Sequence, residues 1–272
     1  GQIESHDADG FTVGNNAGIG NVNGSGDSVV AWNWKAGGTA VSNTDGSITS
    51  TVSANTDAGF SIVSYTGTGA SATVGHGLGV APDVVIVKQR GNTTPWAVYH
   101  SQSNNSANVF YELNTTSGGI TASTVFGSNP TSTVFGIGTD TNTNASSGTY
   151  IAYCFHDVEG YSKFGSYTGN GSTDGTFVYT GFRPAWLMVK RTDTLCSWVI
   201  VDSVRDPINV AGKRIFADSS ASEYTNVDNP DLVSNGFKVR IGSTDNCANA
   251  SGGSYIYMAF ADGQPFKYAN AR

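Results

Sequence analysis

The sequence predicts an all-β fold, built from tandem antiparallel β-sandwich repeats of a jelly-roll-like type. Three observations predict it. Charged residues make up 13% of the chain, about half the usual quarter, and small polar residues replace them, which disfavours helices and favours turns and strands. Apolar residues occur in short runs rich in Val, Ile, Tyr, Phe and Trp, bounded by Gly, Asn, Asp or Pro, as strands are. The third observation is an internal repeat.

The repeat covers most of the chain. A shift of 102 residues aligns 64–101 with 166–203 without a gap, and eleven of the thirty-eight pairs are identical, including the Ser-Tyr-Thr-Gly that opens both segments. A shift of 105 residues aligns 145–157 with 250–262. The difference between the two shifts places a small insertion in the middle of the second copy, where a loop can absorb it. The sequence therefore predicts two copies of one unit of roughly 100 residues.

The segment before the repeats divides into two parts. Residues 28–35, SVVAWNWK, alternate small and aromatic residues as the end of each repeat does. We therefore predict that 1–35 is the C-terminal end of a preceding β domain. Residues 36–58 are rich in Gly, Ser, Thr and Asn and nearly uncharged, as linkers are, and they are predicted to be a connector.

The two repeats are predicted to be β-sandwiches that span 59–162 and 163–272. Strands of the first are expected at 60–66, 83–90, 96–100, 109–113, 133–138 and 149–156. Strands of the second are expected at 176–180, 185–191, 198–202, 214–217, 236–241 and 254–260. Turn signals between neighbouring runs are typical of antiparallel sandwiches. Helical periodicity is confined to the region around 206–214.

Composition and charge exclude several classes of protein. The chain is 38% apolar and 11% aromatic, which supplies a burial force that disordered segments lack. The formal net charge of −7 removes the electrostatic attraction on which nucleic-acid binding relies. We therefore predict no nucleic-acid partner. We also predict no membrane insertion, because no run approaches the roughly eighteen consecutive apolar residues of a membrane span.

Glycines after the first strand of the first repeat resemble a cofactor motif, Gly67-x-Gly69-x-x-Ala72. A dinucleotide-binding loop needs a helix directly after its glycines, because the free amides of the helix N-terminus bind the pyrophosphate. Here β-branched residues, more glycines and Pro82 follow, and a Walker ending is missing. We predict no cofactor and assign these glycines to a hairpin or bulge. The glycine-rich segment 72–82 is expected to be a surface loop that contacts a neighbouring chain.

No metal site is predicted. Asp140, Asn142 and Asn144 have the opening spacing of an EF-hand calcium loop, but the glycine and the glutamate that complete such a loop are missing. A hydrogen-bonded turn explains these residues better, because Asp and Asn bond to their own backbone. A calcium site of another type, built from loop oxygens here or around Asp245, is the alternative.

Catalytic residues are not predicted either. The glutamates of the chain are Glu4, Glu112, Glu159 and Glu223. None recurs at the repeat spacing, and a glycosidase needs two carboxyl groups held across a sugar. His156 and Asp157 follow the last strand of the first repeat, and Asp157 recurs as Asp262, so we expect a turn aspartate beside a histidine. Histidine pairs at metal spacing and a nucleophile elbow are missing, and the protein is predicted not to be an enzyme.

Aromatic and cysteine side chains are the remaining candidates. Trp96, Tyr99 and Trp198 are the candidate glycan contacts, because exposed rings on β-sandwiches stack on sugar faces. Trp96 and Trp198 are equivalent in the two repeats, and packing in the core explains that equivalence more economically. Cys196 and Cys247 both belong to the second repeat, where a disulfide between them is the alternative to free buried thiols.

Several longer segments carry a family resemblance: AWNWKAGG, SNTDGSITSTVSANTDAGFSIVSYTG, GHGLGVAPDVVIVK, GTYIAYCFHDVEGYSKFGSYTGNG and FVYTGFRPAWLMVKRTD. Together they resemble the repeated β-rich domain of virion structural proteins from tailed bacteriophages, especially marine ones. In those proteins the domain commonly follows a concanavalin-like or laminin-G-like domain. The resemblance extends over about residues 28–272 and carries over no catalytic or ligand-binding residues.

The resemblance implies a non-enzymatic structural and adhesion component of a virion, such as a tail fibre, a tail tip or a capsid-attached appendage. It implies location in the extracellular particle and contact with other virion proteins and with a glycan of the host surface. By analogy, such proteins are symmetric homo-oligomers, and a trimer is favoured. The alternative is a carbohydrate-binding, lectin-like or glycan-depolymerising module.

Overall fold

The computed structural model of the protein describes residues 3–7, 10–14, 22–103, 107–225, 230–240 and 246–261. The chain divides into two compact units, Gly1–Trp34 and Lys35–Arg272. In the first unit, β1 (Ile3–His6) pairs with β2 (Phe11–Val13). Residues 28–35, predicted to be a closing strand, are not a strand. The reason is that a strand needs a paired neighbour, and none of the described strands pairs with this segment.

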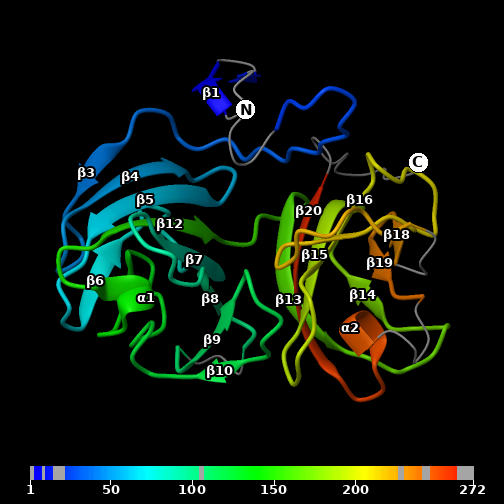
Figure 1. Cartoon of the computed structure of the whole chain (residues 1–272). Coiled ribbons are helices and arrows are strands. Elements are labelled where there is room, and N and C mark those ends of the chain that lie inside the picture. The colour runs from blue at the N-terminus through cyan, green and yellow to red at the C-terminus, as the bar shows by residue number, and fades with distance from the viewer. Residues whose placement is uncertain are drawn as a thin grey trace. The chain divides into compact units, whose positions relative to one another are not determined.

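The second unit contains both repeats and confirms the all-β prediction, with several antiparallel sheets (Figure 1). The strands of its first half are β3 (Val41–Asn43), β4 (Ser50–Asn55), β5 (Phe60–Thr66), β6 (Ala72–Gly75), β7 (Val84–Gln89), β8 (Ala97–His100), β9 (Val109–Glu112), β10 (Ile120–Thr121), β11 (Val134–Ile137) and β12 (Thr149–Phe155). The main sheet has the order β10-β9-β8-β7-β12-β5-β4-β3, and β11 pairs with β6 in a smaller sheet.

The second repeat has the same plan. Its strands are β13 (Ser162–Thr168), β14 (Phe177–Tyr179), β15 (Pro184–Arg191), β16 (Val199–Asp202), β17 (Ile215–Phe216), β18 (Asp231–Val233), β19 (Gly236–Lys238) and β20 (Ser254–Ala261). The main sheet has the order β13-β20-β15-β16-β17, which matches β5-β12-β7-β8-β9 of the first repeat strand for strand. The smaller sheet, β14-β19-β18, extends the β6-β11 pair by one strand.

Each repeat buries its core between the main sheet and the smaller sheet. Alternate residues of a strand point to opposite faces, so Val85 and Val87 of β7 enter the core of the first repeat, together with Phe135 of β11. At the equivalent positions, Leu187 and Val189 of β15 enter the core of the second repeat. The other face of each main sheet, here called the outer face, is therefore free to make contacts outside the repeat's own core.

Residues 36–58, predicted to be a connector, contain β3 and β4. Strand β4 pairs with β5 and extends the main sheet. Val52 and Ser50 are buried while Thr51 is exposed, and the Ser50 hydroxyl donates to the carbonyl oxygen of Gly75 (2.9 Å). Small polar residues resemble a linker in composition, yet a half-buried strand needs an apolar side chain only at every second position.

Two further expectations about local structure are corrected. The segment 72–82, expected to be a surface loop, begins with β6 and the fully buried His76, and only its end, at 79–81, is an exposed loop. The region 206–214 is not helical. The helices of the described residues are α1 (Thr141–Asn144) and α2 (Asn246–Asn249), each one turn long and far too short to cross a membrane.

A buried asparagine at the end of α1 holds the glycine motif of the first repeat. The side-chain oxygen of Asn144 accepts a hydrogen bond from the backbone N–H of Thr68 (2.7 Å). Its amide nitrogen donates to the carbonyl oxygens of Ala70 and Gly138 (2.6 Å each). A Cβ at Gly67 would overlap the carbonyl oxygen of Ala145, the residue after Asn144. The glycine is therefore required by close backbone approach, and not by a phosphate.

The second repeat duplicates this arrangement, which we call the asparagine lock. Asn249 of α2 is fully buried, accepts from the N–H of Asn170 (3.0 Å) and donates to the carbonyl oxygen of Ser172 (2.8 Å). A Cβ at Gly169 would overlap the carbonyl oxygen of Ala250. The paired glycine loops are thus structural elements that fasten the first strand of each repeat to its short helix.

Candidate functional site at the contact between the repeats

The histidine and aspartate considered as catalytic residues lie in a turn. Through Oδ1, Asp157 accepts a hydrogen bond from the N–H of Phe164 (2.7 Å), and through Oδ2 it forms an ion pair with Lys163. The Nδ1 atom of His156 lies 2.7 Å from the carbonyl oxygen of Asp157. Both residues therefore shape the connection from β12 to β13, while the equivalent Asp262 lies outside the described residues.

The loop considered for calcium is occupied by its own hydrogen bonds. Asp140 accepts from the N–H of Asn142 (2.8 Å) and caps α1, and the side chain of Asn144 belongs to the asparagine lock. In the described part of the chain, no group of three His, Cys, Asp or Glu side chains is arranged to hold a metal ion. Asp245, at the counterpart position, lies outside the described residues.

The three candidate glycan-binding aromatics lie in three different places. Tyr99 is 3% exposed and packs edge-on against Phe126 in the core of the first repeat. Trp198 is 2% exposed and lies between the two repeats. The ring faces of these two residues cannot be reached by a sugar. Trp96 is half-buried and stacks on Tyr153 at the outer face of the first repeat, with ring centroids 6.4 Å apart.

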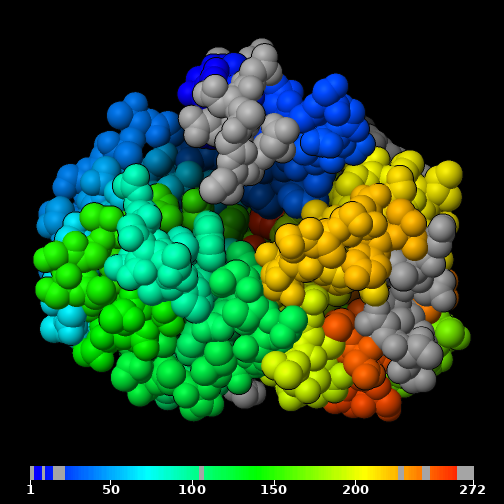
Figure 2. All heavy atoms as spheres, in the orientation of Figure 1, coloured from blue at the N-terminus to red at the C-terminus, as the bar shows by residue number. Residues whose placement is uncertain are grey.

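The outer face of the second repeat packs against one edge of the first repeat, along the seam between them in Figure 2. Trp198 donates from Nε1 to the carbonyl oxygen of Glu112 (2.9 Å), and its ring packs edge-on against Tyr111, 6.2 Å between centroids. The N–H of Gly119 donates to the carbonyl oxygen of Thr192 (2.7 Å). Directional bonds and ring packing together hold the repeats in one arrangement.

A neutral histidine is buried in the same contact. His100 is 1% exposed; its Nδ1 accepts from the N–H of Gln102 (3.2 Å), and its Nε2 donates to the carbonyl oxygen of Tyr257 in the other repeat (3.2 Å). Burial lowers the pKa of His100 from 6.5 to about 4, although the hydrogen bond to Tyr257 and the charge of Asp157 act in the opposite direction. Protonation would break the bond that Nδ1 accepts.

We expect the protein to lose stability as the pH falls from 6.5 to about 4. In this window the unfolded chain protonates His100 and the folded chain does not. The free energy of unfolding therefore falls as the pH falls, by roughly 3 kcal/mol in total. Urea unfolding at a series of pH values measures the slope. The variant His100→Gln should lose the His100 part of the slope. It should keep the parts that come from His76, whose pKa burial lowers, and, close to pH 4, from Asp174 and Asp193, whose pKa values are also lowered. An unchanged slope in the variant would contradict the prediction.

A cleft of about 570 Å³ opens beside this contact, within the size range of small-ligand sites. Its polar lining comes from Gln102, Ser103 and Thr121 of the first repeat and from Ser166, Thr168, Thr192, Asp193 and Ser254 of the second. Tyr111, Tyr167 and Tyr255 also line it, but these three residues are at most 8% exposed. Ser166, Thr168 and Ser254 are exposed, so their hydroxyl groups can form hydrogen bonds with a polar ligand.

The charge of the cleft is limited. Among the described residues that line it, Asp193 is the only carboxylic acid. Arg191 binds Asp193 with two nitrogens, Nε to Oδ1 (2.6 Å) and Nη2 to Oδ2 (3.2 Å), and this hydrogen bonding holds the pKa of Asp193 below its usual value. One ionised and paired carboxylate does not provide the acid and base of a glycosidase. Among the described residues, no second carboxyl group lines the cleft to complete such a pair.

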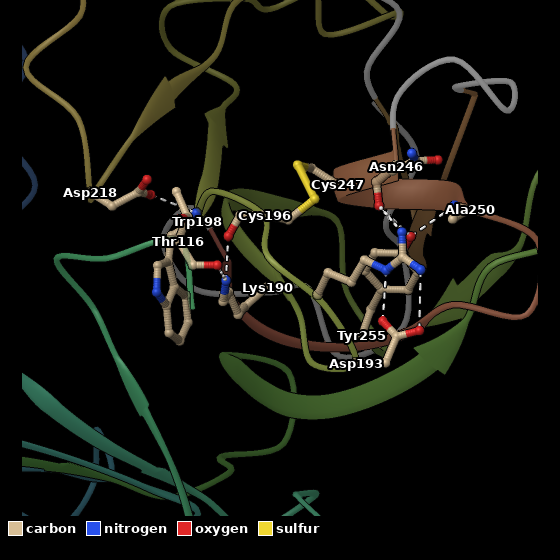
Figure 3. Close-up of a disulfide and its surroundings, with 11 residues drawn as sticks. Thr116, Lys190, Asp193, Cys196, Trp198, Asp218, Asn246, Cys247, Ala250 and Tyr255 are labelled. Atoms are coloured by element: carbon tan, nitrogen blue, oxygen red, sulfur yellow. Dashed lines mark hydrogen bonds and ion pairs between the residues drawn. A yellow bond between two sulfur atoms is a disulfide. The ribbon is translucent and has the colours of Figure 1, made fainter. Parts of the chain in front are cut away.

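A disulfide and a buried lysine organise the loop beside the cleft (Figure 3). Cys196 and Cys247 are joined, with their Cα atoms 5.2 Å apart. The Lys190 ammonium donates to the carbonyl oxygens of Cys196 and, across the contact, of Thr116 (3.0 Å). Burial lowers the pKa of Lys190 to about 8, against the opposing charge of Asp218. The disulfide thus fixes a loop that also binds the first repeat.

Sequence reasoning missed His100 and Lys190. A signal for the lysine existed, because Lys88 and Lys190 are identical in the two repeats and follow apolar strands. A charge in a buried strand must find acceptors, and equivalent lysines point to a repeated role. The histidine had no such signal, since its counterpart is Asp202.

Comparison with known proteins gives one match. The model of a family described as a domain of unknown function (DUF7483) matches residues 1–265. No curated protein and no solved structure matches the chain. The matched segment includes the N-terminal unit, the first repeat and almost all of the second. The chain therefore belongs to the family of the domain of unknown function DUF7483.

Proposed function

We propose that the protein is a non-enzymatic structural and adhesion component of a bacteriophage virion, in a tail fibre, a tail tip or a capsid-attached appendage. The observation that carries the proposal is the packing of two copies of one β unit through a specific contact. Units that stack in this way build stiff, extended arrays. The resemblance of the sequence to tailed-phage structural proteins supports the assignment to a virion.

In this role the protein belongs to the extracellular particle and contacts other virion proteins. Phage appendages present their modules in symmetric copies, so the chain is a homo-oligomer, with a trimer favoured. The low content of charged residues, 13%, supports close packing between chains, because few charges need to be desolvated.

Immunogold electron microscopy of native particles tests this role. An antibody against the purified chain should label one type of appendage, at the same place on every particle. Antibody first absorbed with purified protein is the control and should leave the particles unlabelled. Particles that carry no label, with the chain recovered only in the free fraction, would contradict the proposal.

The cleft between the repeats favours a second function, the binding of a host-surface glycan. Hydroxyl and amide groups, such as those of Ser166, Thr168 and Gln102, are the chemistry with which proteins bind uncharged sugars. The candidate site is then the cleft, and Tyr99 and Trp198 do not take part because they are buried.

Calorimetric titration with a panel of neutral and acidic oligosaccharides tests glycan binding. The variant Ser166→Arg fills the cleft and should weaken binding roughly tenfold or more. Thr173→Arg, at an exposed loop position of the same repeat, is the matched control and should bind as the wild type does. Equal binding by Ser166→Arg would exclude the cleft, and release of reducing sugar by the wild-type protein would contradict the non-enzymatic role.

A further inference from the structure

The contact between the repeats joins two different surfaces. One is the receiving face, the outer face of the second repeat's main sheet, formed by Phe164, Met188, Lys190, Trp198, Ile256 and Met258. Each of these side chains is at most 4% exposed. The other is the inserted edge of the first repeat, which runs from β8 and β9 to Gly119 and contributes His100, Tyr111 and the carbonyl oxygens of Glu112 and Thr116.

The receiving face occurs a second time, on the first repeat. The two repeat shifts place its counterparts at Ile62, Ile86, Lys88, Trp96, Ile151 and Tyr153. The chemical character is kept at every position: four apolar or aromatic residues, one lysine and one tryptophan. With the exception of Ile86, these residues are only half-buried, and a hollow of about 570 Å³ opens over Ile62, Ile151 and Tyr153.

The two lysines show what the first receiving face lacks. Lys190 donates to Cys196 in its own loop and to Thr116 of the adjoining repeat. Lys88 makes the first of these bonds at the equivalent residue, Thr94 (2.7 Å), and its second bond goes to Asn92 of the same loop (2.8 Å). In the first repeat the lysine therefore keeps the hydrogen bond to its own loop. Its second hydrogen bond goes to Asn92 of that loop, where Lys190 instead bonds to the inserted edge.

The segment of the second repeat that corresponds to the inserted edge consists of β16, β17 and the residues up to Tyr224, with Asp202 in place of His100. We call it the inserted edge of the second repeat. This segment exposes apolar side chains at Val204 (81%), Ile208 (77%), Val210 (40%) and Tyr224 (46%). Large exposed apolar side chains concentrated in one segment are typical of contacts between proteins.

We propose that copies of this chain associate head to tail, with the inserted edge of one copy's second repeat seated on the receiving face of the next copy's first repeat. Each chain carries both surfaces twice, and its internal contact uses one of each. Among the described residues, one receiving face, bordered by residues 36–40 of the same chain, and one inserted edge per chain are left for a second copy. A contact between unlike surfaces closes into a ring or continues as a filament, and a ring of three is the trimer favoured above.

Sedimentation equilibrium of the whole chain over a concentration series tests the contact. A face variant, Ile151→Asp with Tyr153→Asp, and an edge variant, Val204→Asp with Ile208→Asp, should each weaken self-association roughly tenfold or more. Each variant still has one intact surface. An equimolar mixture of the two should therefore form a 1:1 complex and nothing larger, which an association of like surfaces would not do. Tyr179→Asp, on β14 and 66% exposed, is the control and should associate as the wild type does.

Urea unfolding of each variant checks that the substitutions leave the fold intact, and serine replaces aspartate at the same positions if one of them does not fold. Wild-type protein that stays monomeric at all concentrations would overturn the proposal. So would variants that associate as the wild type does, or a mixture that yields no 1:1 complex. This contact does not depend on the place of the protein in a virion, so it is tested separately from the proposed function.

Discussion

The variant Asn144→Ala is expected to lower the free energy of unfolding by roughly 3–4 kcal/mol. Asn144 is fully buried, and its amide bonds to the N–H of Thr68 and to the carbonyl oxygens of Ala70 and Gly138. Alanine leaves these groups without that partner. The carbonyl oxygen of Gly138 is in a buried bond, and the other two groups are partly buried. Each lost partner at such a site costs about 1–3 kcal/mol. Urea unfolding followed by tryptophan fluorescence measures the loss.

Two matched variants define the cause of this loss. Asn142→Ala changes the same helical turn but keeps the backbone N–H that bonds to Asp140, so it should change stability by less than about 0.5 kcal/mol. Asn249→Ala removes the equivalent lock of the second repeat and should be comparably destabilising. If Asn144→Ala were as stable as Asn142→Ala, the asparagine would not be what holds the glycine loop.

Reduction of the disulfide between Cys196 and Cys247 is expected to lower the free energy of unfolding by about 4 kcal/mol. The two cysteines are 51 residues apart, and a crosslink across a loop of that length restricts the unfolded chain by about this amount in the loop-entropy treatment. The bond also fixes the loop whose carbonyl oxygen accepts from Lys190. Urea unfolding with and without dithiothreitol measures the difference.

The double variant Cys196→Ser with Cys247→Ser is the control for this prediction. It should be as stable as the reduced wild type and should not respond to dithiothreitol. The remaining thiol does not interfere, because Cys154 is fully buried and burial raises its pKa to about 12. Equal stability of the oxidised and reduced wild-type proteins would contradict the prediction.

Most strands of the repeats could be predicted because their local sequence is unambiguous. β7 and β15 combine β-branched or large apolar residues with turn residues at their ends, and only a strand fits that pattern. Strand β4, STVSAN, lacks such a run. Its side chains suit a linker equally well, and the deciding factor is the free edge of β5, which accepts its backbone hydrogen bonds. The sequence of the segment alone does not show that this strand edge lies beside it.

The candidate site was less predictable. Trp198 and Tyr99 were identified as aromatic residues next to strands, yet their exposure depends on what packs over them. The cleft has no sequence motif, because its lining comes from segments separated by up to about 150 residues, and the polar part of that lining is mostly ordinary serines and threonines. The disulfide was one of two alternatives, since pairing requires close Cα atoms and spacing along the chain does not report distance.

By itself, the sequence determined the all-β class, the duplication, and the reading of the paired glycines as structural elements. These follow from properties that repeat locally: residue preference, alternation and identity at a fixed shift. The tertiary structure alone decided that β3 and β4 extend the first sheet, that His100 and Lys190 are buried between the repeats, and that a cleft remains beside them. The physical reason is that burial and hydrogen-bond partners are set by distant segments, which the spacing of residues along a chain does not specify.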